Sequence, residues 1–180
     1  MLSILAPAPR FSRVRAKIPQ RSTMSGVTVC KICRNVVKEG VIEHEAEMQR
    51  RAARLLPANV PRVVRYEKAL KRMKMELVRG ETLAEWFGEH PSLIPEDIWT
   101  EVRRLVMVLY EAGIVYSDVT GYNFMIERES GKIWMIDFEH CTARAPGPFT
   151  DGDELAEGES WFVREFLSGD SGNVWNEDFA

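Results

Sequence analysis

The sequence predicts an α+β fold with a sheet-rich first lobe and a helical second lobe. Segments rich in β-branched residues surround one helical segment in the first half of the chain. A long amphipathic helix and a short apolar hairpin follow in the second half. A chain of 180 residues that is 45% hydrophobic can bury one sizeable core, so we expect a single domain.

The first lobe is predicted to consist of strands and one helix. β-branched residues indicate one or two strands before Gly40, with a break near Asn35, and Pro57 ends the helix that follows. A basic turn joins the last two strands. The predicted elements are one or two strands within residues 27–38, a helix at 43–56, and strands at 60–66 and 73–78.

Helix signals dominate the second lobe. Thr82 is a suitable N-cap for a short helix, Pro95 is suited to open a long helix, and Gly113 is suited to end it. The long helix has apolar residues at helical spacing, namely Ile98, Val102, Leu105, Val106 and Leu109. The predicted elements are helices at 83–87 and 95–112, strands at 124–126 and 133–136, and a last helix at 154–167.

The last predicted helix has an apolar stripe that allows two interpretations. The stripe consists of Trp161, Phe162, Phe166 and Leu167. We expect it to pack beneath the loop at residues 116–123, and exposure as a binding surface for a partner protein is the alternative.

Residues 1–24 differ in composition from the rest of the chain. They contain five basic residues and no acidic residue. We predict a disordered basic segment at 1–24 and a single domain at 25–180, while a transit peptide or a non-native start before Met24 are the alternatives. Without targeting by this segment, the expected location is cytoplasmic.

Charge, hydropathy and cysteine content narrow the classes of partner and site. The net charge of −3 does not predict direct readout of nucleic acid, and no apolar run is long enough to cross a membrane. Three cysteines, Cys30, Cys33 and Cys141, are too few for a disulfide framework and indicate a reducing compartment. Cys30 and Cys33 have the spacing of a zinc or redox motif, but strand alternation predicts that they point to opposite faces.

Two short motifs in the second half are the most informative about chemistry. Asn123 lies five residues after Asp118, and a short apolar run then ends in Asp137 and Phe138. Carboxylate and amide oxygens are the hard ligands that Mg²⁺ prefers. An ordinary turn would explain Asp118 alone, but not the Asn and the second Asp at these offsets.

This spacing resembles the catalytic loop and the metal-binding Asp of the protein-kinase-like superfamily. The chain is identified as a reduced member, similar to small atypical kinases and to aminoglycoside and choline phosphotransferases, over residues 27–142. The resemblance implies a two-lobed fold with a reduced N-lobe and a truncated helical C-lobe. It also implies that Asp118 orients or deprotonates an acceptor hydroxyl, while Asn123 and Asp137 hold a metal ion at the phosphates of ATP.

The same resemblance implies residues that bind the nucleotide. Lys38, at the end of a predicted strand, would contact the phosphates, and an acidic residue of the next helix would pair with it. Glu47 is the favoured partner, with Glu45 the second choice. The hinge between the lobes would bind adenine through the Glu76 carbonyl and the Val78 amide, and Met75 would line the back of the pocket.

Several positions depart from the superfamily pattern. Tyr116 and Ser117 replace the usual His-Arg before the catalytic Asp, which makes control by a phosphorylated activation loop unexpected. Glu139 replaces the Gly after Asp-Phe, as in choline and aminoglycoside kinases. No glycine-rich phosphate loop is present, since only Gly26 precedes the lysine strand.

We therefore predict an ATP-dependent phosphotransferase that requires Mg²⁺ and transfers the γ-phosphate to a hydroxyl of a protein Ser/Thr or of a small molecule. The alternative is a pseudokinase, an ATP-binding regulatory or scaffold protein without turnover, which the missing glycine loop favours. A partner protein is a further expectation. The acceptor itself is not predictable from these residues.

Overall fold

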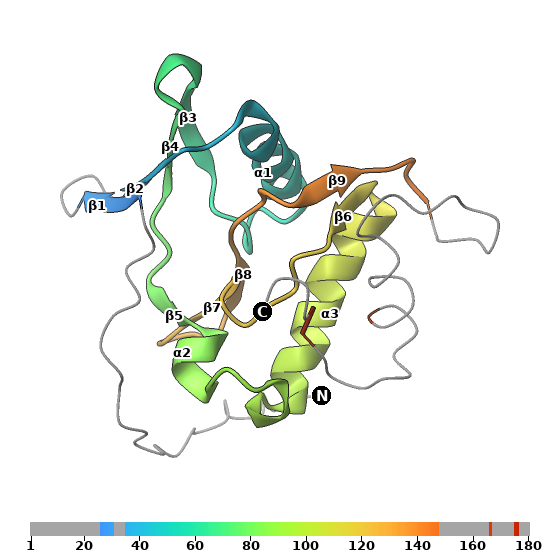
Figure 1. The fold of residues 1–180 in the computed structure, drawn as a ribbon. Helices are drawn as coiled ribbons and strands as arrows, with labels where there is room; N and C mark the ends of the chain where they lie inside the picture. The colour runs from blue at the N-terminus through green and yellow to red at the C-terminus, as the bar shows by residue number, and fades with distance from the viewer. Residues whose placement is uncertain (1–25, 31–34, 148–165, 167–174, 177–180) are drawn as a thin grey trace, which may run out of the picture.

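The computed structural model describes residues 26–30, 35–147, 166, 175 and 176, and these residues form the predicted α+β arrangement (Figure 1). The first lobe is a four-stranded antiparallel sheet with the strand order β1-β2-β4-β3. Its strands are β1 (Val27–Cys30), β2 (Asn35–Glu39), β3 (Val63–Glu67) and β4 (Arg72–Glu76).

Helix α1 (Glu43–Leu55) packs on the first-lobe sheet. Val41, Ala46 and Met73 form a small buried cluster beneath it, with Tyr66 and Met75 at the margin. A one-turn helix (Lys68–Leu70) joins β3 to β4, where the sequence predicts a basic turn.

The second lobe contains the long helix and two small antiparallel sheets. One sheet has the order β5-β7-β8 and the other pairs β6 with β9. The elements are β5 (Gly80–Thr82), α2 (Leu83–Phe87), a one-turn helix (Pro91–Leu93), α3 (Glu96–Glu111), β6 (Ile114–Tyr116), β7 (Phe124–Glu127), β8 (Ile133–Met135) and β9 (Cys141–Ala143).

Local signals in the second lobe act as the sequence predicts. Thr82 and Glu85 form a capping box at the start of α2, because each side chain accepts a hydrogen bond from the backbone amide of the other. The predicted apolar stripe of α3 is buried in the larger core cluster. Gly80 allows β5 to approach β7, since a Cβ there would lie 2.3 Å from the Ile126 carbonyl oxygen.

Some predicted boundaries differ from the observed ones. β4 ends at Glu76, so Val78 lies in the connection between β4 and β5 rather than in the strand. Of the last predicted helix, only Phe166 is among the described residues, and it is buried. The predicted N-terminal segment 1–24 and the predicted orientation of Cys33 lie outside the described residues. Among the described residues, no helix is long and apolar enough to span a bilayer.

Candidate active site

The loop between β6 and β7 holds two of the predicted site residues, Asp118 and Asn123. Its backbone is folded by internal hydrogen bonds, from the Val119 amide to the Ser117 carbonyl (2.9 Å) and from the Asn123 amide to the Thr120 carbonyl (3.1 Å). These bonds fix successive peptide planes of the loop. The loop backbone therefore holds Asp118 and Asn123 in defined positions.

The Asp118 side chain is half-buried, and its Oδ1 atom is fully enclosed without a hydrogen-bond partner among the described residues. Burial raises the pKa of Asp118, while Asn123 and His140 act in the opposite direction. A carboxylate with a raised pKa and an unused acceptor oxygen is suited to receive a proton from a bound hydroxyl.

Asn123 connects this loop to the end of β8. Its carbonyl accepts a hydrogen bond from the Ile136 amide (2.9 Å), and its side-chain Nδ2 donates to the Asp118 carbonyl (3.2 Å). The side-chain oxygen is thus the end of the amide that can bind a cation. Because Ile136 precedes Asp137, the same backbone bond fixes Asp137 relative to the loop.

Asp137 lies where the two lobes meet. Its φ of 59° is in the left-handed region, which Asp tolerates better than most residues. Its Oδ1 accepts hydrogen bonds from Lys38 Nζ (2.9 Å) and from the Glu139 amide (3.4 Å). Lys38 Nζ also donates to Glu45 Oε1 (2.8 Å), so one ammonium group connects β2, α1 and the segment after β8.

The predicted partner of Lys38 is corrected by the structure. Glu45 pairs with the lysine, whereas Glu47 is exposed on the opposite side of α1. Glu45 belongs to the buried face of the helix together with Met48, Gln49 and Ala52. Helical periodicity explains the outcome, because residues 45, 48, 49 and 52 share one face and residue 47 does not.

Burial and ion pairing oppose each other in this pair. The largest single effect on Lys38 is burial, which would lower its pKa, but the carboxylates of Asp137 and Glu45 together outweigh burial and the pKa is raised. Burial raises the pKa of Glu45, whose side chain is only 2% exposed, and the lysine offsets this in part. Each partner therefore depends on the other to remain charged.

Tyr116 and Ser117, which replace the usual His-Arg, have structural roles that the sequence did not reveal. The buried Tyr116 hydroxyl donates to the Ile136 carbonyl, and Ser117 Oγ donates to the His140 carbonyl (3.0 Å). Both bonds join the Asp118 loop to the segment that contains Asp137. No local sequence signal predicts them, because their partners lie 20 and 23 residues away, after the next hairpin.

The predicted hinge residues lie at the connection between the lobes. Lys38 pairs across the sheet with Met73, and Met75 lies two residues further along β4, so Lys38 and Met75 share one face of the sheet. Glu76 ends β4, and the half-buried Val78 follows in the connection. Their positions fit the predicted adenine-binding roles, and those roles stay predictions.

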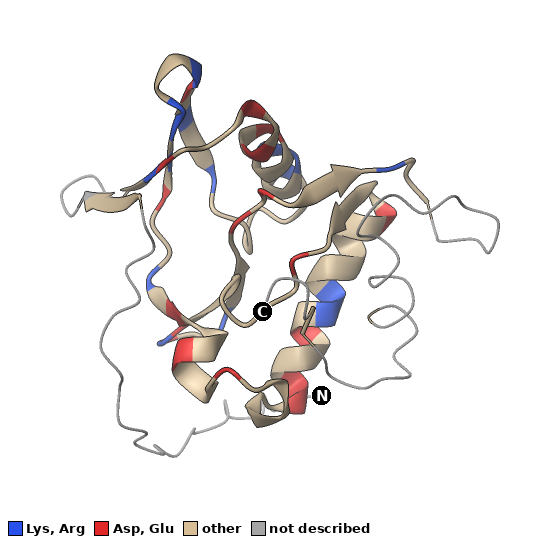
Figure 2. Cartoon of the chain, in the orientation of Figure 1, with Lys and Arg blue, Asp and Glu red and all other residues tan. Residues whose placement is uncertain are grey.

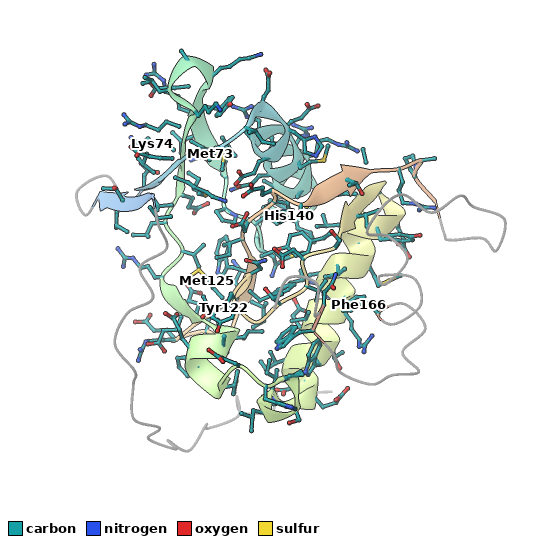
Figure 3. The ribbon with its side chains drawn as sticks, viewed as in Figure 1. Met73, Lys74, Tyr122, Met125, His140 and Phe166 are labelled. Atoms are coloured by element: carbon teal, nitrogen blue, oxygen red, sulfur yellow. The ribbon has the colours of Figure 1, made fainter. Side chains whose placement is uncertain are left out.

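Figure 3 labels two further side chains of the second lobe, Met125 and Tyr122, near β5 and α2. Met125 is half-buried in β7, two residues after Asn123. Acidic residues lie along the loops of the second lobe, whereas basic residues gather on the β3–β4 hairpin of the first (Figure 2).

The donor set fits a metal ion that arrives with a phosphate ligand. Among the described residues, no group of three or more His, Cys, Asp or Glu could hold a metal by itself. Asn123 and Asp137 supply one amide and one carboxylate, and Mg²⁺ is commonly bound by one or two protein oxygens together with substrate phosphates. These two side chains could therefore hold Mg²⁺, as the sequence predicts, and that role stays a prediction.

Comparison with known proteins places this geometry in context. Residues 8–145 match the family model of the RIO domain. The KEOPS complex subunit Bud32 of Pyrococcus abyssi is 39% identical over 94 residues, which cover 52% of this chain and 41% of that protein. The meiotic driver SPOK2 of Podospora anserina is 27% identical over 108 residues, which cover 58% of this chain and 14% of that protein.

A third relative is the 3-deoxy-D-manno-octulosonic acid kinase of Haemophilus influenzae, 28% identical over 50 residues, which cover 27% of this chain and 21% of that protein. The chain thus spans less than half the length of each curated relative. The solved structure of the Cydia pomonella granulovirus kinase PK-1 aligns with a TM-score of 0.51 at 15% identity, over 65% of this chain and 46% of that chain. That likeness shows a shared kinase fold and confirms the predicted reduced, two-lobed architecture.

Proposed function

Because this chain belongs to the RIO domain family, we propose that it is an ATP-dependent phosphotransferase. The reaction breaks the bond between the γ-phosphorus of ATP and the oxygen that bridges to the β-phosphate, releases ADP, and forms a bond from that phosphorus to an acceptor oxygen. The proton of the acceptor hydroxyl passes to Asp118. The acceptor is a protein Ser/Thr or a small molecule with a hydroxyl group.

The proposal rests on one observation, the junction at which Lys38 Nζ contacts both Glu45 and Asp137. That ammonium group is held where it can contact phosphate oxygens. Asp118 and Asn123 are connected to Asp137 through the Ile136 amide and the Tyr116 hydroxyl. Phosphoryl transfer depends mainly on such positioning and on charge, so this arrangement suits it.

Mg²⁺, when bound with ATP, would neutralise the charge that develops on the transferred phosphoryl group. Asn123 and Asp137 are the residues that would hold it. Glu45 keeps the Lys38 ammonium oriented, and enclosure of the Asp118 Oδ1 atom keeps water away from that oxygen.

A second candidate is a regulatory protein that binds ATP without turnover. The connection from β1 to β2 has the sequence Lys31-Ile32-Cys33-Arg34, which contains no glycine to bring the backbone close to phosphates. This observation favours weaker or unproductive ATP binding.

A partner protein forms part of the proposal. Bud32 is a subunit of a complex by its name, and this chain covers only part of that protein. We propose that a partner supplies part of the acceptor-binding surface. A cytoplasmic location stays part of the same proposal.

The test is Mg–ATP binding and ADP formation by purified protein. ATP with Mg²⁺ is expected to raise the unfolding temperature of the wild type. Asp137→Ala should lose the metal-dependent part of that rise, while the matched control Glu139→Ala, at an exposed neighbouring carboxylate, should keep it. Asp118→Ala should retain binding and lose ADP formation.

Each outcome separates the candidates. A wild type that Mg–ATP does not stabilise would contradict both nucleotide functions. Stabilisation without ADP formation, in a lysate and a metabolite extract offered as acceptors, would favour the regulatory protein over the phosphotransferase.

A further inference from the structure

Two residues near the C-terminus, Trp175 and Asn176, lie against the Asp118 loop. Both are buried, and Asn176 is only 1% exposed. The Asn176 amide donates to the Val119 carbonyl (3.0 Å), and its side-chain Nδ2 donates to the Ser117 carbonyl (2.8 Å). These two acceptors belong to the residues before and after Asp118, so one distant residue bonds to the backbone on both sides of the proposed proton acceptor.

Trp175 holds Asn176 in this place. Its ring packs on Trp99 of α3 with 4.4 Å between ring centroids, and its Nε1 donates to the Glu89 carbonyl (3.2 Å). Gly121 of the loop lies beneath the same ring, since a Cβ at that position would be 3.2 Å from a Trp175 ring carbon. The loop, α3 and the segment after α2 thus all contact this residue.

Phe166 provides a second contact between the C-terminal region and α3. Arg103 Nη1 donates to the Phe166 carbonyl (2.6 Å), and the guanidinium lies 5.0 Å from the centre of the Phe166 ring. Figure 3 shows Phe166 beside α3. The position of Trp175 and Asn176 is therefore not an isolated contact.

We propose that Asn176 is a positioning residue for Asp118, an inference that rests on the proposed phosphotransferase function. Its two donors hold the backbone carbonyls of Ser117 and Val119, the residues before and after the aspartate, and so hold the backbone that carries the buried Oδ1 atom. Without them the loop relaxes, water reaches Asp118, and the acceptor hydroxyl is no longer aligned. Nucleotide binding through Lys38 and Asp137 does not depend on these bonds.

The test compares Asn176 with Asn59, a second asparagine whose Nδ2 donates to a backbone carbonyl, that of Ile133, at the same distance of 2.8 Å. Asn→Asp at each position keeps the shape and removes the donor. We expect Asn176→Asp to lower kcat for ADP formation by about 10- to 100-fold while the Kd for Mg–ATP changes less than about twofold. Asn59→Asp should lower the unfolding temperature and leave kcat within about twofold of the wild type.

The split between kcat and Kd is a readout that lost stability alone would not move. The variant Asn176→Leu, which removes the donor without adding a charge, should lower kcat for ADP formation as Asn176→Asp does and leave the Kd for Mg–ATP within about twofold of the wild type.

Two results would overturn the inference. If the wild type forms ADP and Asn176→Asp matches its kcat, or if Asn59→Asp loses kcat to the same degree, Asn176 does not position Asp118. If the wild type forms no ADP, the proposed function itself fails, and the inference fails with it. Failure of the inference alone is recognised by a wild type that does form ADP.

Discussion

The two sides of the candidate site are held in different ways. Asp118 and Asn123 stand on the large core of the second lobe and are fixed by backbone hydrogen bonds and by the buried Tyr116. Lys38 stands on the first-lobe sheet, beneath which the described residues form a buried cluster of only Val41, Ala46 and Met73. The proposed proton acceptor is thus rigidly mounted, whereas the phosphate-binding lysine depends on ion pairs across the lobes.

This contrast shows where the chain is most sensitive to change. The polar contacts of the first lobe surround a small apolar cluster, so few apolar contacts nearby can compensate for their loss. The second-lobe bonds of Tyr116 and Asn176 come from fully buried side chains, so the loss of either bond leaves polar groups that water reaches poorly. The predictions below test each side with matched substitutions.

The largest effect on stability is expected for Lys38→Met. It leaves the Glu45 carboxylate, with a side chain 2% exposed, without its cation, and we expect the free energy of unfolding to fall by about 3 kcal/mol. Lys74→Met is the matched control, because Lys74 is on the neighbouring strand and on the opposite face of the sheet from Lys38, and should change stability by less than about 0.5 kcal/mol. Urea unfolding measures both, and equal losses would refute the dependence of the first lobe on this pair.

A smaller effect is expected where one hydroxyl is removed from each lobe. Tyr116→Phe removes a hydroxyl of a fully buried side chain that donates to the Ile136 carbonyl, and should cost about 1–2 kcal/mol, together with a loss of ADP formation. Tyr66→Phe removes a comparable bond to the Val41 carbonyl (3.1 Å) from a hydroxyl whose side chain is only half-buried, and should cost about 0.5 kcal/mol. Thermal unfolding with a parallel ADP assay checks this order, and a larger cost at Tyr66 would reverse the comparison.

The smallest effect concerns the pH dependence of stability. Because burial raises the pKa of Asp118 above its ordinary value of 3.8, the folded state binds this proton more tightly than the unfolded chain does. The wild type therefore loses stability as the pH rises from the ordinary value through the raised one, and Asp118→Asn escapes this loss. We expect Asp118→Asn to unfold at a slightly higher temperature at neutral pH, with the two proteins converging in acid.

Glu129→Gln serves as the control for that experiment, since Glu129 is an exposed residue of the β7–β8 turn. It should leave the pH dependence of the unfolding temperature unchanged. A destabilised Asp118→Asn at neutral pH would mean that the ionised carboxylate is stabilised by the fold rather than strained by it.

Sequence patterns were sufficient wherever the determining contacts are local. The apolar stripe of α3 from Ile98 to Leu109, the cap at Thr82 and the stop at Gly113 all depend on residues within one or two helical turns. The spacing of Asp118, Asn123 and Asp137 likewise lies within one loop and one hairpin. These features were therefore predictable in both position and type.

The role of Glu45 was present in the sequence pattern but easily overlooked. A helical reading of α1 groups Glu45 with Met48, Gln49 and Ala52, which identifies it as the buried acid, but the alternation of Glu43, Glu45 and Glu47 along the chain hides that face. The contacts of Tyr116 and Asn176 could not be predicted from the sequence. Their partners are carbonyls distant in sequence, and carbonyls have no sequence signature.

The measurement that tests the central claim most directly is ADP formation from Mg–ATP by the wild type and by Asp118→Asn, with Mg–ATP binding measured on the same samples. We predict that both proteins bind the nucleotide alike and that the variant forms ADP at least about 100-fold more slowly. Equal rates in the two proteins would show that Asp118 takes no part in the reaction, and would contradict the proposed site.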